Sequence, residues 1–201
     1  MRYDTKHTSY THRILWNASQ HLYEQAREDS ANSFYMRISC LVMLYSALES
    51  YTNYLGEILK PDVWRDERTF FNSEPYKGTG TLGKVQFLMK ECRSPELDKS
   101  RRPYQTLRNL QKARNFLVHG RTEEVQQEME RDPQEMPKAA VMFLDKHATK
   151  AQLKQALEDV EQVIRTLHQA AQSAFQNDRN IKLDLDPLIG TERLEIGSSK
   201  L

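Results

Sequence analysis

Hydrophobic positions along the chain recur every three or four residues, which is the period of an amphipathic helix. A first stripe predicts a helix from Thr11 to Glu28, and a stronger one predicts a helix from Phe34 to about Leu59, where Pro61 stops the pattern. At roughly 27 residues the second helix would be about 40 Å long. Its apolar arc is wide enough to contact two neighbours, so we expect it to be the central helix.

Three further helices are expected in the rest of the chain. Their ranges are Thr81 to about Cys92, Pro103 to His119, and Thr149 to about Gln176. The stretch 61–80 lacks a helical repeat and is expected to be a loop held to the core by aromatic side chains. These side chains are Trp64, Phe70, Phe71 and Tyr76.

The segment 121–148 is polar and acidic in its first part and is expected to be an insertion. Up to Lys138 the pattern fits a helical extension or a mobile connection, and Ala139–Leu144 is expected to form a short strand. Residues 179–201 lack a helical repeat and are expected to be an extended tail. The sequence thus predicts an all-α fold, an antiparallel bundle of four or five helices over residues 1–178.

Composition excludes several classes of protein. The chain has 201 residues with 29 basic and 28 acidic side chains. Its formal net charge of +1 indicates binding to neither a polyanion nor a membrane. Cys40 and Cys92 lack the spacing of a disulfide framework or a zinc site. Residues 1–13 lack the apolar region of a secretion signal, and Cys40–Leu48 is too short to span a bilayer. We therefore expect a soluble, cytoplasmic protein with no membrane attachment.

Two chemical motifs can be set aside. Gly78–Lys84 fits the first seven positions of a phosphate-binding P-loop, but Val85 stands where the hydroxyl that binds magnesium is required. A glycine turn that begins a short helix is the simpler interpretation. Five histidines show no pairing with carboxylates at metal-ligand spacing, so we expect them at the surface or hydrogen-bonded, and we expect no metal or other cofactor. These are His7, His12, His21, His147 and His168.

The segment 112–121 carries more chemistry, because it places several polar side chains in the last turns of an otherwise apolar helix. Asn115 and His119 are four residues apart and share a face, and Lys112 and Arg108 continue that face backwards. Arg114 is offset by about 100°. The end of a helix favours a protonated imidazole, which could act as a general acid, while the nearby cations could hold a phosphate.

The sequence Arg114-Asn115-x-x-x-His119 resembles the R-x4-6-H signature of the HEPN superfamily, in which a polar residue commonly follows the arginine. The resemblance implies a helical bundle, usually dimeric, and many members are metal-independent endoribonucleases of toxin and phage-defence systems. Arg114 and His119 would be the catalytic pair and Asn115 the adjacent polar residue. Leu44–Tyr51 resembles the family's long helix, which would make the acidic Glu49 a supporting residue.

This resemblance predicts an endoribonuclease whose two active-site copies meet at a homodimer interface. The supporting cations would be Arg108, Lys112 and Arg121. A noncatalytic module that binds a nucleotide or a partner protein through the same face remains an alternative, and a neutralising or activating partner fits either role. Arg2 and His7 also match the signature, but no helical stripe surrounds them.

The two catalytic candidates also have plain structural alternatives. Arg114 could form a salt bridge between helices, and His119 could cap the last carbonyl groups of its helix. The arrangement of the two side chains in the folded protein distinguishes these possibilities.

Overall fold

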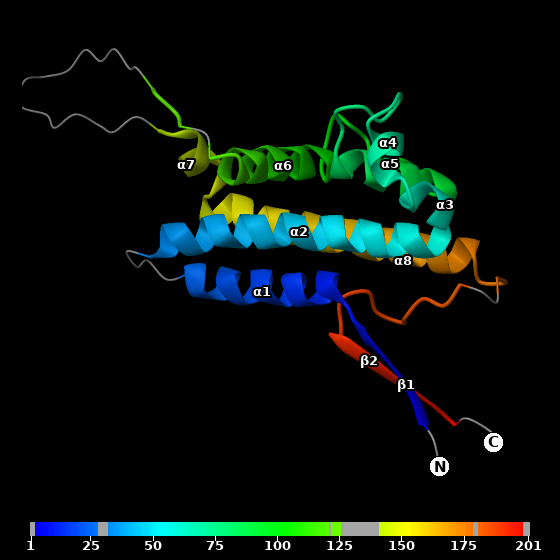
Figure 1. The fold of residues 1–201 in the computed structure, drawn as a ribbon. Helices are drawn as coiled ribbons and strands as arrows, with labels where there is room; N and C mark the ends of the chain where they lie inside the picture. Colours follow the sequence, from blue (N-terminus) through cyan, green and yellow to red (C-terminus); the bar gives the residue numbers. More distant parts are fainter. Residues whose placement is uncertain (1–2, 28–31, 121, 126–140, 179–180, 199–201) are drawn as a thin grey trace, which may run out of the picture.

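The chain folds into helices over most of its length, as the hydrophobic pattern predicts. The computed structural model describes residues 3–27, 32–120, 122–125, 141–178 and 181–198, and within them it contains eight helices and one pair of strands. Figure 1 shows the long helices lying side by side and the strands projecting away from them. None of the helices in these described ranges combines the length and hydropathy that crossing a bilayer requires.

Helix α2, Ser33–Leu59, is the element around which the others pack. It contacts α1, Thr11–Ala26, along its length, and it also contacts α3, α5, α6 and α8. The α2 side chains that point inwards are completely or almost completely buried, because neighbours cover this helix on several sides. The largest of the fully buried side chains on α2 are Leu44, Leu48, Tyr51 and Leu55.

Helix α8, Lys150–Ala174, follows the predicted stripe and packs against α2 and α6. The predicted cap is present, since Thr149 accepts a hydrogen bond from the backbone amide of Gln152. Helices α5, Thr81–Glu91, and α6, Tyr104–Val118, also agree with their predicted ranges within two residues.

The expected loop 61–80 contains two short helices, α3, Pro61–Trp64, and α4, Glu67–Phe71. Proline at the first helical position supports α3, because its missing N–H is not needed there. The aromatic side chains of this region anchor it as predicted: Trp64 and Phe71 are buried and contact the ring of Phe87 on α5.

The lysine of the P-loop-like sequence is buried and binds other side chains of the protein. Lys84 Nζ donates to Asn53 Oδ1 at 2.7 Å and to Glu67 Oε2 at 2.8 Å. A lysine held by a carboxylate in this way is not available to a phosphate. The glycine turn ahead of α5 agrees with the simpler interpretation, since Gly78 and Gly80 both have positive φ angles.

The prediction of a strand at Ala139–Leu144 is wrong in the part that the structure describes. Val141 and Met142 are irregular, and Phe143–His147 forms a short helix, α7. Asp145 Oδ2 accepts a hydrogen bond from the backbone amide of Met142 at 3.1 Å. This bond gives a partner to the amide of the residue that precedes the helix. Within the insertion, residues 122–125 are irregular, and 121 and 126–140 lie outside the described residues.

The two ends of the chain form a strand pair that the sequence pattern did not predict. Strand β1, Tyr3–Ser9, pairs antiparallel with β2, Glu192–Ser198, and the register sets Lys6 opposite Glu195. The chain ahead of β2 is extended, as expected for the tail. It also packs against the helices, because Leu188 is buried in the core.

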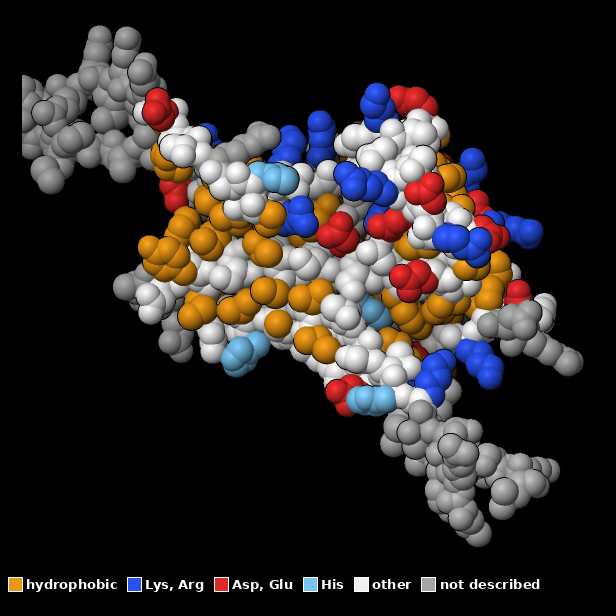
Figure 2. Space-filling view, viewed as in Figure 1, with side chains coloured by type: hydrophobic (Ala, Val, Ile, Leu, Met, Phe, Trp, Pro, Cys, Tyr) orange, Lys and Arg blue, Asp and Glu red, His pale blue; other side chains and the backbone are white. Residues whose placement is uncertain are grey.

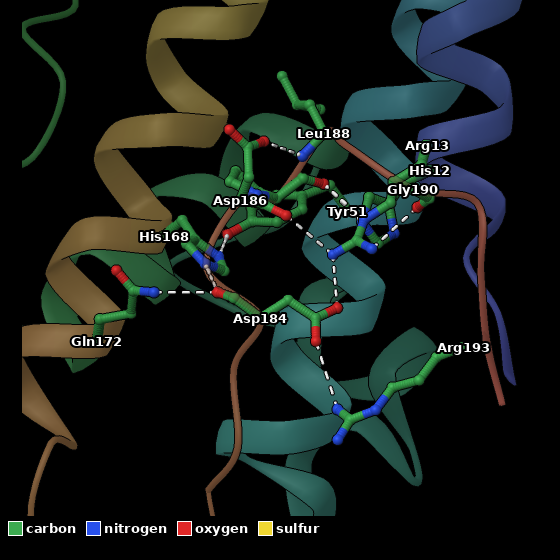
Figure 3. A network of polar contacts seen from close by, with 11 residues as sticks. His12, Arg13, Tyr51, His168, Gln172, Asp184, Asp186, Leu188, Gly190 and Arg193 are labelled. Atoms are coloured by element: carbon green, nitrogen blue, oxygen red, sulfur yellow. Dashed lines mark hydrogen bonds and ion pairs between the residues drawn. The ribbon is translucent and has the colours of Figure 1, made fainter. Parts of the chain in front are cut away.

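A buried polar network fastens this tail to α1, α2 and α8 (Figure 3). Arg13 of α1 donates hydrogen bonds to the carbonyl oxygens of Pro187, Gly190 and Asp186, and its ion pair with Asp184 is 2.6 Å long. Two buried histidines also take part in this network. His12 Nε2 lies 3.0 Å from Pro187 O, and His168 Nε2 lies 2.7 Å from Asp184 O.

We expect this network to make the protein less stable in mild acid. Burial lowers the pKa of His12 to about 4, and the charge of Arg13 acts in the same direction. An unfolded histidine titrates near 6.5, so the unfolded chain binds more protons in the window between these values. The free energy of unfolding therefore falls as the pH drops, by about 2 kcal/mol between roughly pH 7.5 and 5.

Urea unfolding at several pH values checks this expectation. His12→Gln should flatten the pH dependence in that window, whereas His21→Gln, at an exposed histidine of the same helix, should leave it unchanged. Equal slopes for wild type and His12→Gln would contradict the assignment.

Candidate active site

The guanidinium of Arg114 lies between α6 and α2. Its Nη2 is 3.7 Å from Glu49 Oε2, its Nη1 donates to Asn115 Oδ1 at 3.1 Å, and its Cζ lies 5.4 Å from the centre of the Tyr45 ring. About a quarter of the Arg114 side chain, 26%, is exposed, and Glu49 is 36% exposed. The acidic residue of the long helix therefore does face the arginine.

A chain of hydroxyl groups holds Glu49 from a third helix. Tyr45 donates its phenolic proton to Thr81 Oγ1 at 2.8 Å, and Thr81 donates to Glu49 Oε1 at 3.4 Å. Burial raises the pKa of Tyr45, so the phenol stays protonated and remains a donor. Residues of α2, α5 and α6 thus converge on one cluster.

The Arg114 guanidinium has hydrogen-bonding capacity to spare. Its Nε is buried and has no partner among the described residues, and its ion pair with Glu49 is long and partly exposed to solvent. An exposed pair of this kind contributes about 0–1 kcal/mol. Turning the guanidinium towards a bound anion would therefore cost little. The interhelical salt bridge is present, but it does not occupy the arginine fully.

His119 stands at the end of α6, on the surface. Its backbone amide donates to Asn115 O at 3.1 Å, and the following Gly120 has a positive φ of 58° that turns the chain away. The imidazole makes no hydrogen bond within the described part of the chain, so it does not cap the helix carbonyls there. It is free to meet a ligand.

His119 lines a pocket of about 380 Å³ next to the arginine cluster. The other lining residues are Lys112, Asn115, Phe116 and Phe143. The predicted face of α6 thus does gather Lys112, Asn115 and His119. Asn115 belongs to both the arginine cluster and the pocket, because its side chain contacts Arg114 and also lines the pocket.

Two of the predicted supporting residues are not placed in this pocket. Arg108 is exposed one turn before Lys112 and is not among the lining residues. Arg121 lies outside the described residues.

Comparison with protein-family models, with curated proteins and with solved structures gives no match. The function proposed below therefore rests on the chain's own residues.

Within the described residues no three His, Cys, Asp or Glu side chains lie close enough to hold a metal ion. Cys40 and Cys92 are free and buried, and burial raises the pKa of Cys40 to about 12 and that of Cys92 to about 11. Neither thiol is therefore a ready nucleophile or ligand.

The sequence missed three residues of this region: Tyr45, Thr81 and Phe143. Tyr45 lies four residues before Glu49 on the same helix face, a spacing that could have suggested it. Thr81 and Phe143 come from distant segments, and only the packing of α5 and α7 brings them here.

Proposed function

We propose that the chain is a metal-independent endoribonuclease with a HEPN-type antiparallel helical bundle, which acts in the cytoplasm as a homodimer. The observation that carries the proposal is that Asn115 connects two groups. Its side chain accepts a hydrogen bond from Arg114, which has an unpaired donor and lies beside Glu49. It also lines the same pocket as the exposed His119. A cation for a phosphate and a proton carrier are the parts that RNA cleavage needs.

The proposed reaction begins with attack of a ribose 2′-hydroxyl oxygen on the adjacent phosphorus. The bond from phosphorus to the 5′-oxygen breaks, leaving a 2′,3′-cyclic phosphate and a 5′-hydroxyl. One imidazole takes the 2′-hydroxyl proton and another protonates the leaving oxygen. Arg114 stabilises the negative charge on the phosphoryl oxygens, and Asn115 orients the arginine or the phosphate.

This scheme calls for two proton carriers, and each chain offers one His119 at the site. A twofold dimer supplies the second. The order of residues on α6 fits such a composite site, because Arg114 and His119 are five positions apart and point about 140° away from each other around the helix axis. In a cleft between two copies, Arg114 of one protomer and His119 of the other can therefore both face the substrate.

Exposed apolar side chains on the surface of the helices support self-association. Figure 2 shows hydrophobic side chains gathered along α1 and α2 and around the α7 end of the molecule. Val118 is 54% exposed one residue before His119, and Tyr35 at the start of α2 is 63% exposed. Large apolar groups that cluster on a surface often mark a protein interface.

RNA should be cut and DNA left intact, because DNA lacks the 2′-hydroxyl nucleophile. The test compares matched RNA and DNA oligonucleotides with the full-length protein in EDTA, and mass spectrometry identifies the ends. We expect a 2′,3′-cyclic phosphate on the RNA product. Cleavage of both substrates, or loss of RNA cleavage on chelation, would contradict the proposal.

The second candidate is a noncatalytic HEPN-like module that binds a nucleotide or a partner protein through the same face, including a neutralising or activating partner. The net charge of +1 favours it, since surfaces that bind RNA are usually basic. The contact of Arg114 with Glu49 also favours it, because it lowers the local positive charge.

A further inference from the structure

The pocket beside His119 has an aromatic wall that the proposed cleavage chemistry does not use. Phe116 of α6 and Phe143 of α7 contact each other with ring centres 5.1 Å apart and planes inclined by 33°. Both rings are partly exposed, and both line the pocket. Partly exposed aromatic side chains that line a pocket beside a cation are a platform on which an unstacked base of single-stranded nucleic acid can pack.

Several contacts fix this wall in place. The backbone amide of Phe143 donates to Glu123 Oε2 at 2.6 Å, and the Phe143 ring packs against His147, with ring centres 4.3 Å apart. Phe116 sits on the same helix as Asn115 and His119. Along the chain, Phe116 is therefore three residues from the proton carrier His119.

The polar groups of the pocket are mainly donors. Lys112 has only N–H groups. The Asn115 carbonyl oxygen accepts from Arg114, so its NH₂ group is the part of this side chain that has no partner among the described residues. Guanine and uracil present carbonyl oxygens to such donors, whereas adenine and cytosine carry an exocyclic amine at the corresponding position. Donors in the pocket can therefore distinguish bases by the chemistry of that one position.

We infer that this pocket is a nucleobase subsite, in which the base next to the cleaved bond stacks on Phe143 and Phe116 and presents a carbonyl oxygen to Lys112 and Asn115. The inference rests on the proposed function for the position of the cleaved bond. It names the substrate as single-stranded RNA with guanine or uracil at this position. His119 remains available for proton transfer at the edge of the same pocket.

Binding can be measured separately from cleavage with 2′-O-methyl RNA, in which the nucleophile is blocked. The probes are labelled heptamers of cytidine in which the central residue is guanosine, uridine, adenosine, cytidine or abasic, and the readout is fluorescence anisotropy with the full-length protein. We expect the guanosine and uridine probes to bind about tenfold more tightly than the others.

Two substitutions separate stacking from carbonyl recognition. Phe143→Leu should weaken binding of the preferred probes by about tenfold or more, whereas Phe143→Tyr retains the ring and the affinity. Phe175→Leu, at a partly buried phenylalanine at the far end of α8, is the matched control and should bind like wild type. Lys112→Met, at an exposed position, should remove the preference for guanosine and uridine.

Each outcome bears on the inference in a distinct way. Equal binding of all five probes, or unchanged binding by both Phe143→Leu and Lys112→Met, would overturn the subsite. Neither result would contradict the proposed RNA cleavage. The absence of any binding would overturn the subsite as well. Selective binding without cleavage of unmodified RNA would support the subsite and contradict the nuclease.

Discussion

Replacing His119 by alanine is expected to reduce RNA cleavage by a factor of about 10²–10⁴, the usual contribution of a general acid or base. The imidazole is exposed and makes no hydrogen bond within the described residues, so its loss should change the free energy of unfolding by no more than about 0.5 kcal/mol. Single-turnover cleavage of a labelled RNA, together with urea unfolding, measures both quantities.

The companion variant and its control sharpen this test. Arg114→Ala should lower cleavage by a similar factor, because it removes the charge that stabilises the phosphoryl oxygens. His21→Ala removes another exposed histidine, on α1, and should cut RNA like wild type. If His119→Ala and Arg114→Ala both cleave normally, the activity does not come from this site. If neither they nor wild type cleaves, the binding module is the better description.

Replacing Arg13 by methionine is expected to lower the free energy of unfolding by about 3–5 kcal/mol, the cost of breaking a buried ion pair by removing one partner. The Arg13 side chain is only 4% exposed and is the main link between α1 and the tail. Its loss would leave the carbonyl oxygens of Asp186 and Gly190 without this donor. Urea unfolding followed by circular dichroism gives the difference.

Arg165 provides the matched control on the same tail. It pairs with Asp186 and Glu161 but is 38% exposed, so Arg165→Met should cost no more than about 1 kcal/mol. Limited proteolysis should release the tail of Arg13→Met first. Equal unfolding midpoints for the two variants would show that the buried network does not hold the tail.

The positions of the long helices were predictable because helical periodicity is a local property of the sequence. The stripe that begins near Phe34 and ends before Pro61 corresponds to α2 within a residue, and Thr149 caps α8 as its position indicated. The pairing of β1 with β2 was not predictable in this way. It joins segments more than 180 residues apart, as in Ser9 and Glu192, and neither segment shows a clear alternation of apolar and polar residues.

The region around Phe143 shows how a local pattern can mislead. A run of apolar residues before Asp145 suggested a strand, because short apolar runs fit strands and helices alike. The structure forms a helix from Phe143, since Asp145 accepts a hydrogen bond from the Met142 amide just before the helix and the Phe143 ring packs on Phe116. The second of these contacts comes from α6, which lies far away in the sequence.

By itself the sequence determined the helical class, the ranges of the long helices and the shared face of Asn115 and His119, all of which follow from spacing within one helix. Tertiary structure alone decided that Glu49 meets Arg114, that Thr81 steadies Glu49, that Phe143 closes the pocket and that Arg13 fastens the tail. The reason is physical: each of these contacts joins side chains from different elements, and their distances are fixed only when the helices bury their apolar faces against one another.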